Sequence, residues 1–353
     1  MTAIAPHSLP EQVHLWWRSF GARPAVGGSP DLSCLETAAQ ALRDCLDAGL
    51  LNVSLPGECT AERWAVFEAF ASIDLTLVRL VEGHADAVAI LHELGHGPVD
   101  SAGGVWGVWA ASPKSIRATP TANGWRLRGS RKWCSGAAVC TRALVTAETP
   151  DGVGLFVIDN DGVAVSPVPE SWPAVGMAGT DSRTVDFVDA PAEQIGKIGA
   201  YVERPGFWHG GAGVAACWYG GAVGVAEALR SAAAKGSADP HRLAHLGAVD
   251  AALAAGRATL DACAQAIDAD PGDVAGTAAR RTLQTRMIIE SVAEQVLRHT
   301  GRALGATPLC QDRAHARRVA DLSVYIRQSH AESDLEALGR LAAHSQRTVY
   351  DDD

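Results

Sequence analysis

Hydrophobic and polar positions along the first third of the chain repeat with the spacing of a helix. Near its start the apolar residues recur every three or four positions, with charged residues between them: Leu35, Ala38, Ala39, Leu42 and Leu46. This spacing predicts an amphipathic helix. Similar patterns predict two further helices, over 61–73 and 75–94.

The pattern changes after residue 103. Over 104–190, short runs rich in Val, Leu and Trp alternate with turn-forming pairs such as Asp151-Gly152 and Asp161-Gly162. This is typical of an antiparallel sheet or barrel. The pair Asn123-Gly124 predicts a hairpin, because both residues tolerate the positive φ of a type I′ turn.

Helical patterns return after about residue 203. They predict four helices, rich in Ala and Gly, over 206–235, 240–268, 273–304 and 311–347. The predicted fold class is therefore α+β, in three domains. Residues 1–102 form an N-terminal helical domain, 103–195 a middle antiparallel β-barrel or sandwich domain, and 196–353 a C-terminal four-helix bundle domain.

Composition narrows the possible functions of these 353 residues. The net charge of −10 argues against a nucleic-acid partner, which needs clustered Lys and Arg. Neither a signal peptide nor an uninterrupted apolar run of about 18 residues is visible, so we expect no membrane partner. The eight cysteines are scattered without ligand spacing, which favours reduced thiols and no metal site. We expect a cytoplasmic enzyme.

One segment of the β region combines an aromatic and a hydroxyl residue. It reads Arg131-Lys-Trp-Cys-Ser-Gly136, with Trp133 and Ser135 two positions apart. On a regular strand this spacing puts both side chains on one face. There an aromatic wall can shield a flat cofactor while the hydroxyl holds its polar edge. The alternative is a Trp in the barrel core beside an exposed Ser.

With this segment between two helical blocks, the chain resembles the acyl-CoA dehydrogenase superfamily of flavoproteins. That family has a Gly-x-Lys-x-Trp-Ile-Thr-Asn type segment at the end of a middle-domain strand, where the Trp packs beside the flavin ring and the Thr lies near flavin N5. The resemblance extends over about residues 60–345, including the stretches 74–84, 176–191 and 218–229. It implies FAD as cofactor, bound by Trp133, Ser135 and Gly136.

The resemblance implies two further cofactor-binding residues in the C-terminal block. Arg242 matches an Arg that reaches the flavin pyrophosphate of a neighbouring subunit, so a homodimer or homotetramer is expected; a guanidinium suits a phosphate. Gly301 lies in a segment, Thr300–Gly305, that matches one approaching the dinucleotide. The alternatives are a solvated charge for Arg242 and tight helix packing for Gly301.

The chain departs from the family at the residues that perform dehydrogenation. The family's Thr-Glu-Pro-x-x-Gly-Ser-Asp loop is matched only by the shortened stretch 109–115. The carboxylate that removes a proton from the substrate is also missing, since Arg327 and Val214 occupy its two known positions. Binding of a CoA thioester is therefore not implied.

A continuous helix is predicted over 317–341 in place of the segment that carries this carboxylate. On it Arg327, His330 and Asp334 share one face, with Glu290 on a different helix. Related flavin monooxygenases resemble this arrangement in having a His near the flavin, and a His can exchange a proton near neutral pH. Arg327 and His330 are therefore the candidate catalytic residues. The alternative is a solvated salt-bridge surface.

Three functions remain open. The first is an FAD-dependent oxidoreductase that takes a hydride from a small molecule, for example an acyl thioester. The second is a reduced-flavin monooxygenase on the same fold. The third is a non-catalytic relative, favoured by the lost carboxylate and opposed by the retained Trp133 and Ser135.

Overall fold

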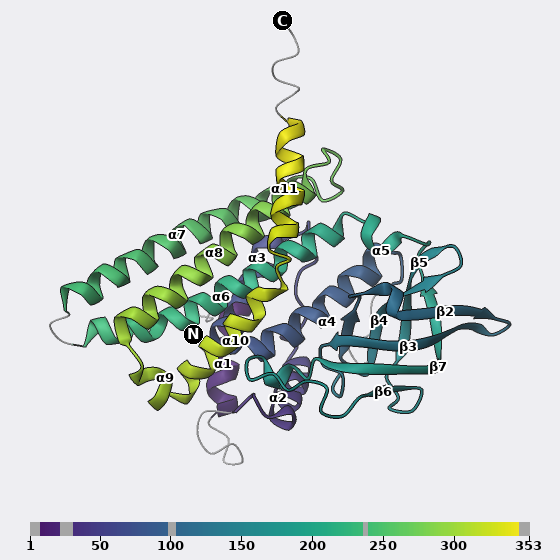
Figure 1. Cartoon of the computed structure of the whole chain (residues 1–353), viewed down its shortest axis with the longest axis horizontal. Helices are drawn as coiled ribbons and strands as arrows, with labels where there is room; N and C mark the ends of the chain where they lie inside the picture. Colours follow the sequence, from purple (N-terminus) through teal and green to yellow (C-terminus); the bar gives the residue numbers. More distant parts are fainter. Residues whose placement is uncertain (1–7, 22–30, 98–103, 236–238, 346–353) are drawn as a thin grey trace, which may run out of the picture. The chain divides into compact units, whose positions relative to one another are not determined.

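The computed structural model describes residues 8–21, 31–97, 104–235 and 239–345 (Figure 1). The chain forms two compact units. One comprises Met1–Val53 and Thr76–Phe207, and the other comprises Ser54–Leu75 and Trp208–Asp353. The N-terminal helices are thus divided between the two units. The predicted boundary at residues 102 and 103 lies outside the described residues, and the three-domain division stays a prediction.

The first unit contains a β-barrel. Its strands are β1 Trp106–Trp109, β2 Ile116–Thr121, β3 Gly124–Cys134, β4 Arg142–Thr149, β5 Gly152–Asp159, β6 Val165–Pro167 and β7 Arg183–Ile195. The strand order is β1-β4-β2-β3-β7-β5, and β5 also pairs with β4, which closes a ring (Figure 1). The middle β-barrel predicted from the sequence is present. Its pairing is mostly antiparallel, but β4 runs parallel to β1 and β2.

The predicted hairpin joins β2 and β3, with Thr121 opposite Gly124. Its backbone differs from the predicted type I′ turn, because Gly124 has φ +101° while Asn123 has no positive φ. Of the two predicted positive φ angles only the one at Gly124 is present, at the residue that adopts it without steric cost.

Helix α4, Leu75–Glu93, packs against the barrel. Ala87, Ile90 and Leu91 form one buried cluster with Trp106 of β1, together with Leu144, Leu155 and Ile195 of the sheet. The other helices of this unit are α1 Leu9–Gly21, α2 Leu35–Asp47 and α5 Ala200–Glu203, with 3-10 turns η2 Pro113–Ser115 and η3 Ala178–Thr180. Apolar burial on this scale provides most of the stability of such a layer.

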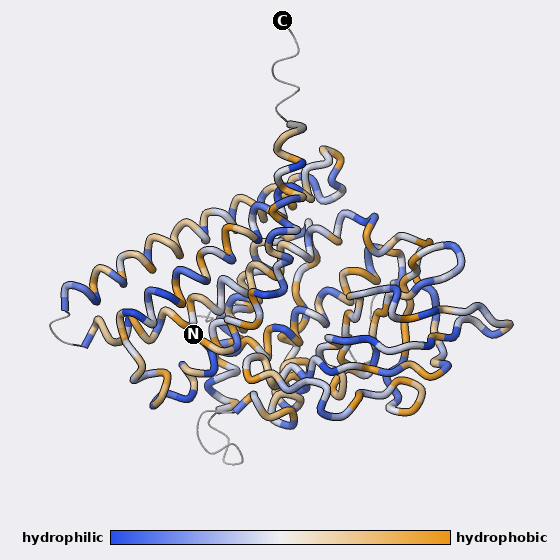
Figure 2. Tube along the Cα trace, in the orientation of Figure 1, coloured by the Kyte–Doolittle hydropathy of each residue, from blue (hydrophilic) through white to orange (hydrophobic). Residues whose placement is uncertain are grey.

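The second unit is helical. Its elements are α3 Thr60–Ile73, α6 Gly206–Ala234, α7 Pro240–Ala269, α8 Ala278–Leu304, α9 Thr307–Gln311, α10 Arg313–Tyr325, η4 Ile326–Gln328 and α11 Glu332–Ser345. Hydrophilic and hydrophobic residues both recur along α7 and α8 (Figure 2). Among the described residues, α6 is long and apolar enough to cross a membrane, but 78% of its most apolar stretch is buried inside the protein, as in a core helix.

The prediction of a continuous helix over 317–341 is wrong. Helix α10 ends at Tyr325, and α11 begins only at Glu332. Between them Ser329 is extended and Ala331 has φ +46°. Arg286 of α8 donates to the carbonyl of Gln328 at 3.0 Å, so a tertiary contact stabilises the end of the first helix. No Gly or Pro marks this break, and the helical pattern alone gave no sign of it.

Candidate functional site

The Trp133 segment ends β3 in an irregular way. The register between β3 and β7 shifts between Arg131 and Cys134, and Trp133 has φ +64°. The prediction that Trp133 and Ser135 share one face of a regular strand is therefore wrong, because the bulge interrupts the alternation. Trp133 is 61% exposed, while Ser135 lies beyond the strand and is partly buried. An exposed Trp on strained backbone is a feature that binding sites often contain.

Ser135 is the end of a chain of three hydroxyl groups. Its Oγ lies 2.8 Å from Oγ of Ser182, which lies 2.8 Å from Oγ1 of Thr180. Thr180 Oγ1 in turn donates to the carbonyl of Met177 at 2.7 Å. Thr180 and Ser182 are buried, so this chain connects the interior to the more accessible Ser135.

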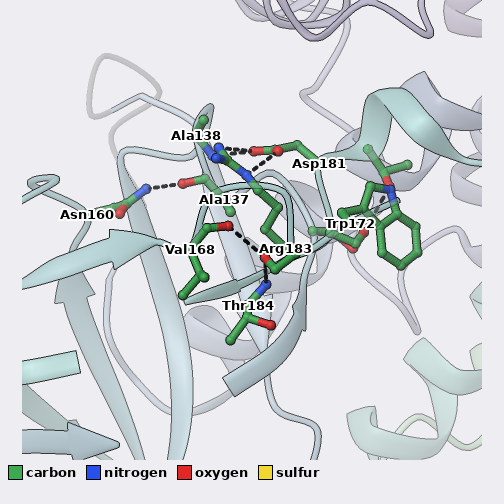
Figure 3. A network of polar contacts seen from close by, with 12 residues as sticks. Ala137, Ala138, Asn160, Val168, Trp172, Asp181, Arg183 and Thr184 are labelled. Carbon is green, nitrogen blue, oxygen red and sulfur yellow. Dashed lines mark hydrogen bonds and ion pairs between the residues drawn. The ribbon is translucent and has the colours of Figure 1, made fainter. Parts of the chain in front are cut away.

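The loop after β3 is tied to the residues that precede β7. The N–H of Gly136 donates to the carbonyl of Thr180 at 2.7 Å, and the N–H of Ala138 donates to the Asp181 carboxylate at 2.8 Å. Asp181 also pairs with Arg183 at 2.5 Å, so it joins both segments (Figure 3). Gly136 has φ +72°, and a Cβ there would lie 2.7 Å from the Cys140 sulfur. Glycine is therefore required at this position for packing.

The shortened stretch 109–115 is held by a buried cation. Arg131 is 1% exposed and donates to the carbonyl of Trp109 at 2.5 Å, to that of Ser112 at 3.2 Å and to the Thr146 hydroxyl at 3.1 Å. Burial lowers its pKa to about 10, so it remains charged at neutral pH. Trp109 in turn donates its indole N–H to the carbonyl of Ser135 at 2.9 Å. The stretch that lost the family's loop residues is thus fixed by a side chain from the Trp133 segment.

A small cavity of about 10 Å³ lies beside Ser135. Its walls come from α4, β1 and the loop after β3: Arg79, Leu80, Gly83, Trp106, Gly107, Val108, Ser135 and Cys140. Burial raises the pKa of the Cys140 thiol to about 12. A cavity of this size holds about one water molecule and is far smaller than a typical ligand pocket, so a ligand that contacts Ser135 would lie outside it.

Two buried titratable residues of α4, Glu82 and His84, contact residues that line this cavity. Glu82 forms an ion pair with Arg79, yet burial raises its pKa to about 7. His84 accepts a hydrogen bond at Nδ1 from the N–H of Trp106 at 3.2 Å, and burial lowers its pKa to about 4. Glu82 is therefore a carboxyl group that can gain or lose a proton near neutral pH.

Arg242 and Gly301 belong to the second unit, at one end of the α7–α8 pair. Close to them in sequence, His245 of α7 and His299 of α8 have Nδ1 atoms that lie 2.9 Å apart. The Nε atom of Arg242 is buried and, among the described residues, has no hydrogen-bond partner. Burial, with help from Arg298, lowers the pKa of His299.

The two candidate catalytic residues lie in the break between α10 and α11. Arg327 forms ion pairs with Glu290 at 3.1 Å and Glu294 at 2.6 Å. The His330 side chain is 77% exposed, and its Nδ1 lies 3.2 Å from Asp334. The i, i+4 contact of His330 with Asp334 therefore exists, but at the start of α11. The catalytic roles of Arg327 and His330 stay predictions, as do the cofactor roles of the other candidates.

Several residues of the site were not found from the sequence. Some of them lie in stretches that carry the resemblance, but none was assigned a role: Arg131, Glu82, Thr180, Ser182 and His245. Their importance comes from burial and from contacts with residues distant in sequence, such as Ser135 with Ser182. One signal was available: Thr180-Asp181-Ser182 is a run of three polar residues between Gly179 and a strand.

Comparisons with known proteins identify the fold. No family model and no curated protein matches the chain. Among solved structures, dibenzothiophene monooxygenase TdsC from Paenibacillus sp. A11-2 is 19% identical, with a TM-score of 0.76, over 94% of this chain and 95% of that one. KijD3, in complex with FMN and a dTDP-linked amino-keto sugar, is 16% identical, with a TM-score of 0.79, over 100% and 97%.

A third similar structure is methanesulfinate monooxygenase MsuC from Pseudomonas fluorescens. It is 17% identical, with a TM-score of 0.74, over 96% of both chains. TdsC has also been solved with FMN and indole together. The predicted architecture of N-terminal helices, central β-barrel and C-terminal helical region is confirmed. The protein has the acyl-CoA dehydrogenase-like fold.

Proposed function

We propose that this protein is a reduced-flavin-dependent monooxygenase that uses FMN and acts on a small organic molecule. The observation that carries this proposal is the match in fold over nearly the whole chain to TdsC and KijD3, whose structures contain FMN. The FAD expected from the sequence gives way to FMN, and the monooxygenase alternative becomes the leading hypothesis.

The residues present fit a flavin. Trp133 offers an exposed aromatic face beside Ser135, which lines the small cavity. The buried, unpartnered Nε of Arg242 suits an anion, and FMN carries one phosphate. In this proposal Trp133 packs beside the flavin ring, Ser135 meets its N5 edge, and Arg242 of a neighbouring subunit binds the phosphate. Gly136 and Gly301 allow the backbone to approach the cofactor.

When bound and reduced, the flavin supplies the electrons with which O₂ is activated and one oxygen atom is transferred to the substrate. The protein contributes binding, exclusion of water and proton exchange. Trp133 covers the ring, and Arg131 fixes the stretch 109–115 beside it. In this proposal His330 donates a proton to the substrate or accepts one from it, and Arg327 supplies positive charge for an anionic substrate group.

Dehydrogenation is the weaker alternative. It requires a carboxylate beside the substrate to remove a proton. Arg327 and Val214 occupy the two positions where the sequence comparison expected one. Arg327 forms ion pairs with Glu290 and Glu294. Its guanidinium is positively charged and cannot accept a proton, so it cannot act as the base.

Incorporation of an oxygen atom from O₂ into a product tests the proposal. The purified protein, supplied with FMN and an NADH-dependent flavin reductase, is mixed with indole, the molecule bound in TdsC, and the products are analysed by mass spectrometry with ¹⁸O₂. We expect more ¹⁸O-labelled product than in a reaction that contains FMN and the reductase without this protein. The Trp133→Ala variant is the matched control.

Two results would replace the proposal. Anaerobic bleaching of bound flavin by a saturated acyl-CoA would establish dehydrogenation instead. A protein that takes up neither FMN nor FAD would support the non-catalytic alternative. We also propose, from the expected role of Arg242 at a neighbouring subunit's cofactor, a homodimer or homotetramer in the cytoplasm.

A further inference from the structure

The three hydroxyl groups at the site have a fixed direction of donation. A hydroxyl carries one proton, and two oxygens 2.7–2.8 Å apart need a proton between them. The carbonyl of Met177 can only accept, so the proton of Thr180 is donated to it. Thr180 Oγ1 must therefore accept at its second contact.

The direction passes along the chain to Ser135. Because Thr180 accepts, Ser182 donates its proton to Thr180. Ser182 must then accept from Ser135, whose single proton is directed inward. The Ser135 oxygen therefore presents lone pairs, and no proton, to a ligand that contacts it from the accessible side.

The surrounding backbone keeps this chain in place. Thr180 is 1% exposed and Ser182 is 7% exposed. The carbonyl of Thr180 accepts from Gly136, and a Cβ on Gly179 would lie 1.8 Å from the carbonyl oxygen of Leu32. The loop is thus packed too closely to rotate its hydroxyls away, so the donation order is a fixed property of the folded unit.

We propose that Thr180 and Ser182 orient Ser135 as a hydrogen-bond acceptor, and that this makes the site select reduced over oxidised flavin. The inference rests on the proposed function, in which Ser135 meets flavin N5. That nitrogen carries a hydrogen in the reduced ring and only a lone pair in the oxidised ring. A Ser135 oxygen that only accepts can form a hydrogen bond with the N5–H of the reduced ring. It faces the N5 lone pair of the oxidised ring without a proton between them, which is unfavourable. Thr180 and Ser182 are positioning residues, since they act through Ser135.

The test is the ratio of dissociation constants for oxidised and reduced FMN. Both are measured anaerobically by fluorescence or calorimetry on apoprotein, with dithionite as reductant. We expect the wild type to bind reduced FMN at least about tenfold more tightly, the worth of one hydrogen bond. For a two-electron couple, tenfold corresponds to about 30 mV in the midpoint potential of bound FMN.

Thr180→Val is the decisive variant. Without Oγ1 at residue 180, Ser182 is free to donate to Ser135, and Ser135 is then free to donate to oxidised N5. The ratio should fall by about tenfold, chiefly through tighter binding of oxidised FMN. Ser182→Ala frees the Ser135 proton in the same way. A merely structural role would weaken both forms equally and leave the ratio unchanged.

Thr149→Val is the matched control. Thr149 is also buried and donates its hydroxyl to a carbonyl three residues ahead, that of Gly152, at the turn between β4 and β5. Its ratio should equal that of the wild type. Should Thr180→Val lose its fold, Ser182→Ala gives the same reading with a smaller change in volume.

The outcomes are distinct. A wild type that binds both forms equally, or oxidised FMN more tightly, overturns the inference and leaves flavin binding intact. An unchanged ratio in both Thr180→Val and Ser182→Ala also overturns it. Failure to bind either form overturns the proposed function itself.

Discussion

The β-barrel and the break between α10 and α11 both contain candidate residues, but they hold them in different ways. In the barrel unit, Ser135 is connected to buried Ser182 and Thr180, and Arg131 is 1% exposed with several carbonyl partners. In the helical unit, Arg327 and His330 have side chains that are 53% and 77% exposed, and they pair with carboxylates of Glu290, Glu294 and Asp334. Interior contacts determine the geometry of the first group, while solvent screens the second.

Replacing Arg131 should produce the largest effect on stability. Arg131→Met leaves the carbonyls of Trp109 and Ser112 without their donor in the interior. We expect a loss of about 3–5 kcal/mol in the free energy of unfolding, measured with urea. Arg128→Met is the control, since Arg128 lies on the same strand, is exposed and pairs with Asp189. It should cost less than about 1 kcal/mol. Equal losses in both would remove the distinction between the two regions.

The next effect concerns pH. Burial raises the pKa of Glu82 to about 7 from 4.5, so the folded protein holds a proton that the unfolded chain releases between these values. Stability should therefore fall as pH rises from 4.5 to 7, by at most about 3 kcal/mol from this residue. Glu82→Gln should flatten the slope of unfolding free energy against pH.

Glu68 in the helical unit allows a direct comparison. Burial raises its pKa to about 7 as well, against the opposing charge of Arg257. Glu68→Gln should remove a further part of the same slope, and the double variant should remove both. If the slope is unaffected by either change, the two carboxyl groups are ionised in the folded protein.

A smaller effect is expected for Trp133. Because the side chain is 61% exposed, Trp133→Ala should leave the melting temperature nearly unchanged. The dissociation constant of FMN should rise about tenfold, the worth of one stacking contact. Val188→Ala, a change at a residue 67% exposed on β7, is the control and should leave FMN binding unaltered. Normal FMN affinity in Trp133→Ala would place the flavin elsewhere.

The smallest effect on stability is expected in the break between the helices. Arg327→Gln and His330→Gln remove exposed ion pairs and should each cost less than about 1 kcal/mol. Their turnover decides the catalytic prediction. A proton-transfer role for His330 predicts a loss of about 10²–10⁴ in rate with the fold intact. Full turnover in both variants would show that Arg327 and His330 have no catalytic role.

The sequence predicted the fold well because helices and strands have different hydrophobic periods. The helices over 61–73 and 75–94 correspond to α3 and α4, and the barrel occupies the region where turn-forming pairs were frequent. Regular patterns miss irregular backbone, however. The bulge at Trp133 and the break at Ser329 arise from contacts with distant residues, which no local spacing reveals.

The candidate site was predicted only in part for a similar reason. Trp133 and Ser135 belong to a recognisable segment, and the structure does place Ser135 at a small cavity. The groups that orient it, Ser182 and Thr180, lie more than forty residues further along and gain their role through burial. A short motif can reveal a residue that contacts a ligand. It does not reveal the distant residues that orient this side chain.

Cys134 and Cys140 are buried, and their burial protects both thiols from oxidation. Burial raises the pKa of each thiol to about 12, so almost none is ionised at neutral pH. Oxidants attack the thiolate, so both sulfurs are inert although Cys140 borders the cavity. If the proposed monooxygenase function is correct, these two thiols would resist oxidation by the oxygen species formed near them.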